Sequence, residues 1–196
     1  MSRQLELTPQ RGDALLLVDM QNDFLPGGAL AVASGDQVIA VLNVWLARFA
    51  AAGLPVFATR DWHPAQHCSF QTHGGPWPPH CVAGTHGAGL TGALHWPSGT
   101  QIISKATTPD AEAYSGFCHT DLHERLQTAK VTRLFVGGLA TDYCVLETVL
   151  AALQHGYRVV LLQDGIRAVE AQAGDGKRAI ALMIAADAVL LEGCMW

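Results

Sequence analysis

The sequence predicts an α/β protein of three layers, in which helices cover both faces of a mainly parallel sheet of roughly six strands. Short aliphatic runs alternate along the chain with segments whose apolar residues recur every three or four positions. The aliphatic runs lack the polar alternation of a strand with one wet face, as expected for a parallel sheet buried on both sides. Without an internal repeat or linker, the sequence predicts a single domain over residues 1–196.

The first half of the chain supplies three predicted strands and one long helix. The run "ALLLVDM" (14–20) is apolar up to its acid, and "DQVIAVLNVWLARFAAA" (36–52) has helical spacing with a glycine after it. Strands are expected at 54–61 and 100–106. About forty residues rich in Gly, Pro and His join these two strands, and loops of that length are uncommon unless they are functional.

The second half continues the alternation of helix and strand. Helices are predicted at 120–129, 141–156 and 175–186, and strands at 131–138, 157–165 and 187–192. This order of elements favours right-handed crossovers that place helices on both faces of the sheet.

Composition excludes several classes of partner. The chain is 49% hydrophobic and 15% charged, with a net charge of -5 and no basic cluster, so nucleic acid and membranes are not expected partners. With neither a signal peptide nor a spanning segment in the sequence, we expect a cytoplasmic protein. The expected partner is a small-molecule substrate, and the sequence is compatible with a homo-oligomer.

The cysteines do not form a disulfide framework. Their number is odd, none stands in a CxxC pair, and the expected compartment is reducing. For Cys68, Cys81 and Cys118 we expect packing or reversible oxidation. The two other cysteines are Cys144 and Cys194.

Reactive side chains stand where the predicted strands end. Asp19, Asp61 and Lys105 close the first three strands, and Cys144 follows the fourth. Ligands of open parallel sheets bind outside the carboxyl ends of the strands, so these residues should converge at one edge. Taken singly, Asp19 and Lys105 are better explained by a structural role, either as an ion pair at the sheet edge or, for Asp19, as an acceptor for the backbone at Asn22 or Asp23.

Cys144 has a stronger case for chemistry. Thr141 or Asp142 can cap a helix whose first turn holds the thiol, and a helix amino terminus favours the thiolate. The alternative is an inert buried thiol. A thiol, a carboxylate and a lysine at one edge have the parts of nucleophilic catalysis, and the turn "GGLAT" (137–141) can offer amides to an oxyanion.

The loop from 61 to 86 is rich in metal-ligand residue types. It contains Asp61 together with His63, His67, His73, His80 and His86. Asp61 and His63 stand two apart, so an extended backbone points both the same way, and a later histidine can complete a set with open coordination positions. A solvated histidine-rich loop explains the spacing equally well.

Aromatic residues are interleaved with these groups. Phe24, Trp62, Trp77 and Tyr114 can line a pocket for a flat apolar ring, although aromatic residues also serve packing.

Five blocks resemble one known family. "LLLVDMQNDFLPGGAL", "RDWHPAQHCSF", "GGPWPPHCV", "ISKAT" and "GLATDYCV" are similar to the nicotinamidases and pyrazinamidases of the isochorismatase-like cysteine hydrolases, and the resemblance runs from about Ala14 to Leu191. It implies a Rossmann-like fold and deamidation of nicotinamide, and of pyrazinamide, through a cysteine thioester in NAD salvage. The alternatives are another amide or ureide hydrolase of this superfamily, or a metal- or redox-responsive binding protein.

The resemblance also assigns the main roles. It carries the family's catalytic triad onto Asp19, Lys105 and Cys144. The ligands of one divalent metal ion map onto Asp61, His63 and His80, which favours the metal interpretation of the histidine loop. Zinc is the expected ion, and iron or manganese also suit these ligands.

Further expectations concern the substrate. A cis peptide between Leu139 and Ala140 is implied, with the amides of Ala140 and Cys144 forming the oxyanion hole. The resemblance places the substrate ring between Phe24, Trp77 and Tyr114. Some relatives have a fourth protein ligand in the region of His73, which no family motif secures here.

Overall fold

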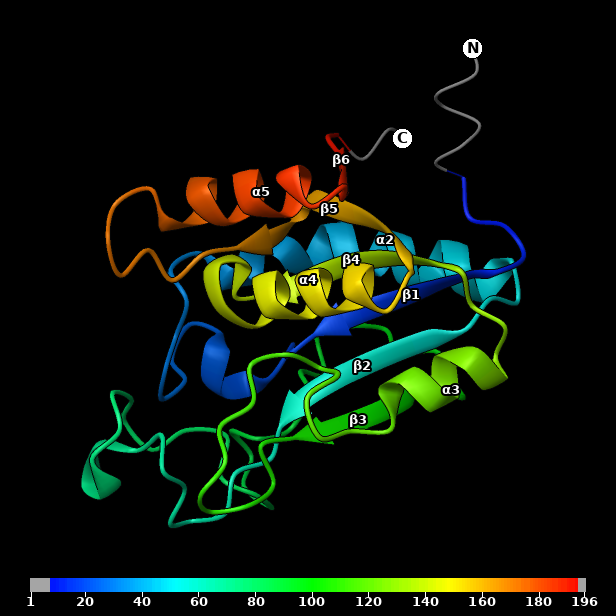
Figure 1. The fold of residues 1–196 in the computed structure, drawn as a ribbon. Helices are drawn as coiled ribbons and strands as arrows, with labels where there is room; N and C mark the ends of the chain where they lie inside the picture. The colour runs from blue at the N-terminus through cyan, green and yellow to red at the C-terminus, as the bar shows by residue number, and fades with distance from the viewer. Residues whose placement is uncertain (1–7, 194–196) are drawn as a thin grey trace.

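One six-stranded sheet organises the computed structural model, which describes residues 8–193, so that Cys194 and the first seven residues lie outside the description. The strand order is β3-β2-β1-β4-β5-β6 (Figure 1), and every neighbouring pair is parallel, as predicted. The strands are β1 (Asp13–Val18), β2 (Val56–Asp61), β3 (Gln101–Lys105), β4 (Arg133–Leu139), β5 (Arg158–Arg167) and β6 (Val189–Leu191).

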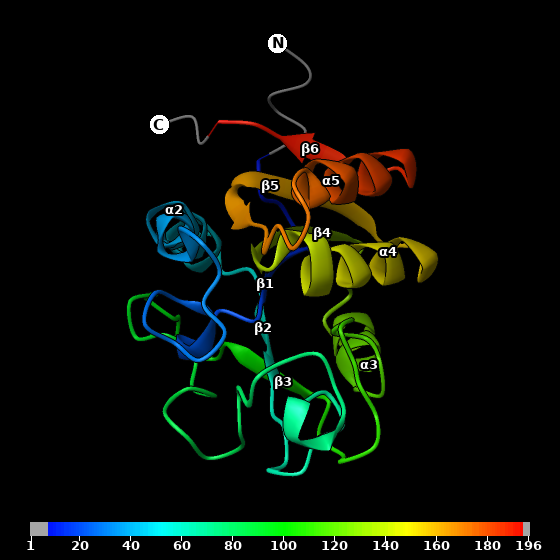
Figure 2. The same cartoon turned by 90° about the vertical axis from the view of Figure 1, so that its left-hand side faces the viewer.

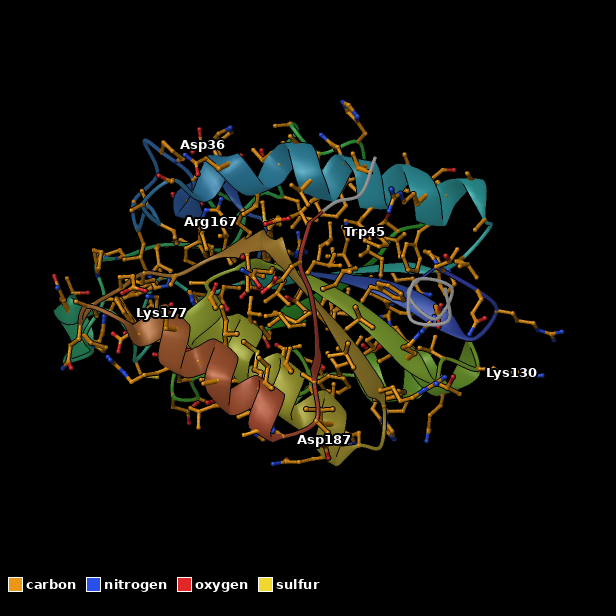
Figure 3. The ribbon with its side chains drawn as sticks, turned by 90° about the horizontal axis from the view of Figure 1, so that it is seen from above. Asp36, Trp45, Lys130, Arg167, Lys177 and Asp187 are labelled. Carbon is orange, nitrogen blue, oxygen red and sulfur yellow. The ribbon has the colours of Figure 1, made fainter. Side chains whose placement is uncertain are left out.

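Helices cover both faces of this sheet. They are α2 (Val38–Ala51), α3 (Leu122–Thr128), α4 (Leu146–Gln154) and α5 (Asp175–Ala185). Figure 2 shows α2 on one face and the other three helices on the opposite face. In Figure 3, α2 and α5 lie on opposite sides of β5. The three-layer prediction is therefore confirmed.

The central strand explains why its sequence is continuously apolar. All six residues of β1 are buried. Leu15 and Leu17 pack in the cluster on the α2 side, whereas Leu16 and Val18 pack in the cluster beneath the other helices. Because both faces of this strand lie in a core, apolar residues are favoured at every position, and the alternation of apolar and polar residues seen in half-exposed strands is absent.

The segment predicted as one helix over 141–156 begins differently. Its first turn, η4 (Thr141–Val145), is π-helical, with the amide of Val145 donating to the carbonyl of Ala140 at 3.1 Å. Regular α-helix starts only at Leu146. The peptide bond between Leu139 and Ala140 is cis, as the family resemblance implied. Single π-turns often occur at functional sites.

The order of the strands locates the edge where a site is expected. β1 and β4 are neighbours at the centre of the sheet, and the chain leaves them toward opposite faces. Ligands of open α/β sheets bind at such a switch point, outside the carboxyl ends of the strands. No helix within residues 8–193 has both the length and the apolar character needed to cross a membrane.

Candidate active site

Lys105 stands at the centre of a buried charged cluster. Its Nζ lies 2.9 Å from Asp19 Oδ2, 2.5 Å from Asp61 Oδ1 and 3.4 Å from Cys144 Sγ, and it donates to the carbonyl of Ala113 at 3.1 Å. The contact with Asp61 follows from the register of the sheet, which pairs Asp61 on β2 with Lys105 on β3. The predicted convergence of the strand-end residues is therefore confirmed.

Burial sets the electrostatics of this cluster. Burial lowers the pKa of Lys105, but the carboxylates of Asp19 and Asp61 outweigh it and hold the pKa well above its ordinary value. Burial also raises the pKa of Asp19, which the ammonium of Lys105 opposes only in part. A permanently charged lysine thus faces a carboxylate that is more basic than usual.

Thr59 on β2 orients the carboxylate of Asp19. The hydroxyl of Thr59 donates to Asp19 Oδ1 at 2.6 Å, and the amide of Asp19 donates to the carbonyl of Thr59 at 3.2 Å. Asp19 follows β1 with a left-handed backbone (φ 49°), and its side chain is completely buried. The carboxylate therefore has a fixed orientation beside Lys105 and Cys144.

Cys144 lies in the π-helical turn η4 and is only 6% exposed. Its burial raises the pKa of the thiol well above the ordinary value, and Lys105 opposes that rise without cancelling it. The expectation of a low-pKa thiol is therefore wrong for the resting site, because desolvation and the carboxylates of Asp19 and Asp61 raise the pKa more than the ammonium of Lys105 lowers it. The thiol has a base at hand, since Sγ and carboxylate oxygens of Asp19 and Asp61 lie within 4.8 Å of one another.

A second group of buried ligands borders this cluster. Asp61, His63 and His80 each present one ligand atom, and the three atoms lie within 4.8 Å of one another. His63 Nδ1 lies 3.2 Å from the carbonyl of Ala106, and His80 Nδ1 lies 2.8 Å from that of Pro78. A carbonyl partner requires an N–H at Nδ1, and in the tautomer with that proton Nε2 is the ring atom that can donate an electron pair to a metal ion.

The state of His63 tests whether these residues suit a cation. Its Nε2 is buried without a hydrogen-bond partner among the described residues and lies 3.7 Å from Asp61 Oδ2. Burial, reinforced by the neighbouring histidines, lowers the pKa of His63 to about 3, so the ring is neutral. A buried lone pair that faces a carboxylate is unfavourable unless a cation lies between them, so the residues fit a divalent metal ion.

The other histidines of the loop have different surroundings. His67 is buried and stacks on His63, with ring centroids 4.1 Å apart. Its Nδ1 contacts Ser69 Oγ at 2.7 Å and its Nε2 contacts the carbonyl of Ala111 at 3.1 Å, so both ring nitrogens are engaged. His73 lies on an exposed turn and belongs to none of the ligand groups found among residues 8–193.

A pocket with about 440 Å³ of empty space, part of it open to solvent, reaches the charged cluster at Cys144 and the ligand group at Asp61, His63 and His80. The predicted Phe24, Trp77 and Tyr114 line it together with Cys144, Ala140 and the three metal-ligand candidates. The indole N–H of Trp77 donates to the hydroxyl of Tyr114 at 3.1 Å, which fixes two of the aromatic walls. Trp62 is not part of this lining, because its ring packs beneath the guanidinium of Arg60 at 3.6 Å.

Sequence reasoning missed the other lining residues, which are Leu30, Val32, Glu112, Tyr143 and Val169. Tyr143 is next to Cys144, and its ring contacts Trp77 and Tyr114 at centroid distances of 5.2 and 5.6 Å. Its position beside the thiol was a usable signal. Val169 is an ordinary aliphatic residue after β5, and no local pattern distinguishes it.

Comparisons with known proteins agree with this geometry. The isochorismatase domain model matches residues 13–190. The nicotinamidase of Escherichia coli is 40% identical over 204 residues, covering 93% of this chain and 96% of that protein. The crystal structure of a pyrazinamidase of Pyrococcus horikoshii in complex with zinc is 45% identical with a TM-score of 0.89, covering 93% of this chain and 99% of the other.

A structure from L. infantum in complex with nicotinate is also similar, at 40% identity and a TM-score of 0.85 over 92% of each chain. The domain match spans most of the sequence, and both the blocks and the buried groups fall within it. The chain therefore belongs to the isochorismatase family.

Proposed function

We propose that this chain hydrolyses nicotinamide to nicotinate and ammonia, and pyrazinamide likewise, as a single-domain cytoplasmic enzyme of NAD salvage. The observation that carries the proposal is the position of Cys144, a buried thiol that contacts Lys105 and lines a pocket with aromatic walls and three candidate metal ligands. The similarity to nicotinamidases and pyrazinamidases over nearly the whole chain supports the choice of substrate.

The first half of the reaction acylates Cys144. Asp19 accepts the thiol proton, and its raised pKa suits a base that must take a proton from a weak acid. The sulfur attacks the amide carbon of the substrate, and the amides of Ala140 and Cys144 hold the developing oxyanion. The charge of Lys105 stabilises the anionic partners throughout. Asp19 then returns the proton to the leaving ammonia.

The second half releases the acid. Water attacks the nicotinoyl thioester while Asp19 again accepts a proton, and that proton returns to the sulfur of Cys144 as nicotinate leaves. One carboxylate therefore acts as base and acid in turn, which its fixed hydrogen bond from Thr59 permits without any rearrangement.

The pocket orients the ring. Phe24, Trp77 and Tyr114 wall a flat heteroaromatic group, so that its carboxamide reaches the thiol. Asp61, His63 and His80 would hold a divalent ion, zinc first with iron and manganese as alternatives, which supplies a Lewis acid for the ring nitrogen or a nearby water.

Ammonia release tests the proposal. Purified protein is assayed with nicotinamide, pyrazinamide and ureides, with and without added zinc, and nicotinamide and pyrazinamide should be turned over. Turnover restricted to ureides would assign the chain to another branch of the superfamily. No turnover of any compound, despite zinc binding, would favour a binding protein.

The variant Cys144→Ala separates chemistry from folding. It should retain the circular dichroism spectrum and the zinc content of the wild type while losing ammonia release, because only Sγ is removed. Substantial remaining turnover would refute Cys144 as the nucleophile.

A further inference from the structure

Asp142 takes no part in the chemistry above, yet it is fixed by two hydrogen bonds. It lies in η4 two residues before Cys144. Its Oδ1 accepts from the amide of Val169 at 2.9 Å, and its Oδ2 accepts from the amide of Glu170 at 2.9 Å. Both carboxylate oxygens are therefore bound to consecutive amides of the segment that follows β5, which we name the 168–174 segment.

The 168–174 segment is tightly turned. Glu170 has a left-handed backbone (φ 57°), and its carboxylate accepts from the amides of Gly174 at 2.6 Å and Gly176 at 3.0 Å. A Cβ at Gly176 would lie 2.8 Å from the Cβ of Ala168, so the start of α5 presses closely on the segment. Glu170 thus fixes the segment to α5, while Asp142 fixes it to the turn that carries the cysteine.

This second attachment affects the pocket directly. Val169 lines the pocket, and it packs against the apolar cluster that contains Phe24 and Ala140. Cys144 and Tyr143 line the same pocket from η4. The carboxylate of Asp142 is therefore a direct bridge between the Val169 wall and the turn with the thiol.

We propose that Asp142 is a positioning residue that holds Val169 in register with Cys144 and so sets the width of the pocket for an unsubstituted flat ring. The choice of ring rests on the proposed function. A wall displaced by a fraction of an ångström loosens the contacts that enclose the bound ring, which weakens binding and admits a substituted ring. A ring methyl group is the matched probe, because one extra methyl or methylene in an apolar pocket changes selectivity by ~10–200-fold.

The decisive variant is Asp142→Asn in zinc-supplemented protein. It keeps the size of the side chain but replaces one accepting oxygen by an amino group that faces a backbone N–H. We expect kcat for nicotinamide to change less than about threefold while KM rises ~10-fold, the loss expected for a hydrogen bond to a charged group. The preference for nicotinamide over its ring-methylated analogues should fall ~10-fold.

Two further variants calibrate this result. Val169→Ala truncates the wall itself. The methylnicotinamide isomer (4-, 5- or 6-methyl) for which this variant relaxes the preference is the one whose methyl group contacts Val169. Asp175→Asn is the matched control, because Asp175 accepts from the amide of Gln172 at 2.7 Å and pairs with Arg178. Among the described residues it has no hydrogen bond or ion pair to η4, and only its charge acts on Tyr143 of that turn. Asp175→Asn should keep the wild-type KM and preference.

The outcomes separate this inference from the proposed function. Wild-type protein that releases no ammonia refutes the proposed function, and the preference is then read from calorimetric binding of nicotinate and its methylated forms, which needs no turnover. The inference is supported if Asp142→Asn relaxes the preference toward the isomer that Val169→Ala identifies. It is overturned if Asp142→Asn keeps the wild-type preference, if Asp175→Asn shifts it equally, or if Val169→Ala relaxes it for no isomer.

Discussion

Replacement of Lys105 by methionine would isolate what the buried ammonium contributes. Methionine is similarly long and unbranched, so the change removes the charge with little loss of packing. Asp19 and Asp61 would then share a buried site without the cation that lies 2.9 and 2.5 Å from them. Removing one partner of a buried ion pair typically costs about 3–5 kcal/mol, because the charge that stays behind is uncompensated.

This cost converts into a measurable shift of the unfolding temperature. In a domain of this size, each 1 kcal/mol lowers Tm by roughly 2–4 °C, so Lys105→Met should lower Tm by about 6–20 °C. The loss should be larger in chelator than in zinc, since a cation held by Asp61 compensates part of the charge. Ammonia release should be abolished in both conditions.

Two companions make the measurement specific. Lys130→Met changes an exposed lysine after α3 and should move the free energy of unfolding by less than about 0.5 kcal/mol. The double variant Lys105→Met with Asp19→Asn removes one of the two like charges and should regain at least about 1 kcal/mol without regaining activity. A single variant within 1 kcal/mol of the wild type, or a double variant that regains nothing, would refute this account of the cluster.

Three further changes test other parts of the structure. Gly87→Ala places a Cβ 2.2 Å from Oδ2 of Asp23, the oxygen that accepts a hydrogen bond from the amide of Cys81. Because Cys81 follows His80, displacement of Asp23 should misplace His80, and the variant should lose zinc in a dialysis that leaves the wild type loaded. Full retention of zinc would contradict this. Thr59→Val removes the hydroxyl that donates to Asp19, a charge-assisted bond of about 1.5–3 kcal/mol, so kcat should fall ~10–100-fold at unchanged zinc content, and an unchanged kcat would count against an oriented base. Phe49→Ala empties a fully buried position on α2, so urea unfolding should show a loss of about 3–5 kcal/mol with kcat at 25 °C unaffected, whereas a loss below about 1 kcal/mol would mean that the cavity collapses.

The strands could be predicted from the sequence because of their burial. β1 and β4 are buried along their whole length, so their aliphatic runs are uninterrupted and mark the strands to within a few residues. The edge strand β6 is shorter than its run of apolar residues, since Val189 is 50% exposed and only Val189–Leu191 pair with β5. The π-helical start of η4 escaped prediction because its bond from Val145 to Ala140 leaves no mark on the apolar spacing.

The part of the site that could be predicted from the sequence is the part formed by residues at or just after the ends of strands. Asp19, Lys105 and Cys144 converge because parallel strands share an edge, and this follows from the order of elements alone. The direct contact of Asp61 with Lys105 depends on the register between β2 and β3, which the sequence does not display. The raised pKa of the Cys144 thiol depends on how completely the final packing excludes water, which no local motif encodes.

The position of Lys105 on an edge strand has a consequence for assembly of the fold. β1 and β2 bring Asp19 and Asp61 together, but the ammonium arrives only when β3 joins β2. Without β3, Asp19 and Asp61 are two like charges with no cation beside them, so their carboxylates favour contact with water. Pairing of β3 with β2 is therefore required before this region can exclude water, and the thiol of Cys144 contacts the ammonium of Lys105 only where β3 is in place. A molecule in which β3 is not paired would therefore contain the thiol of Cys144 but not the ammonium of Lys105 beside it.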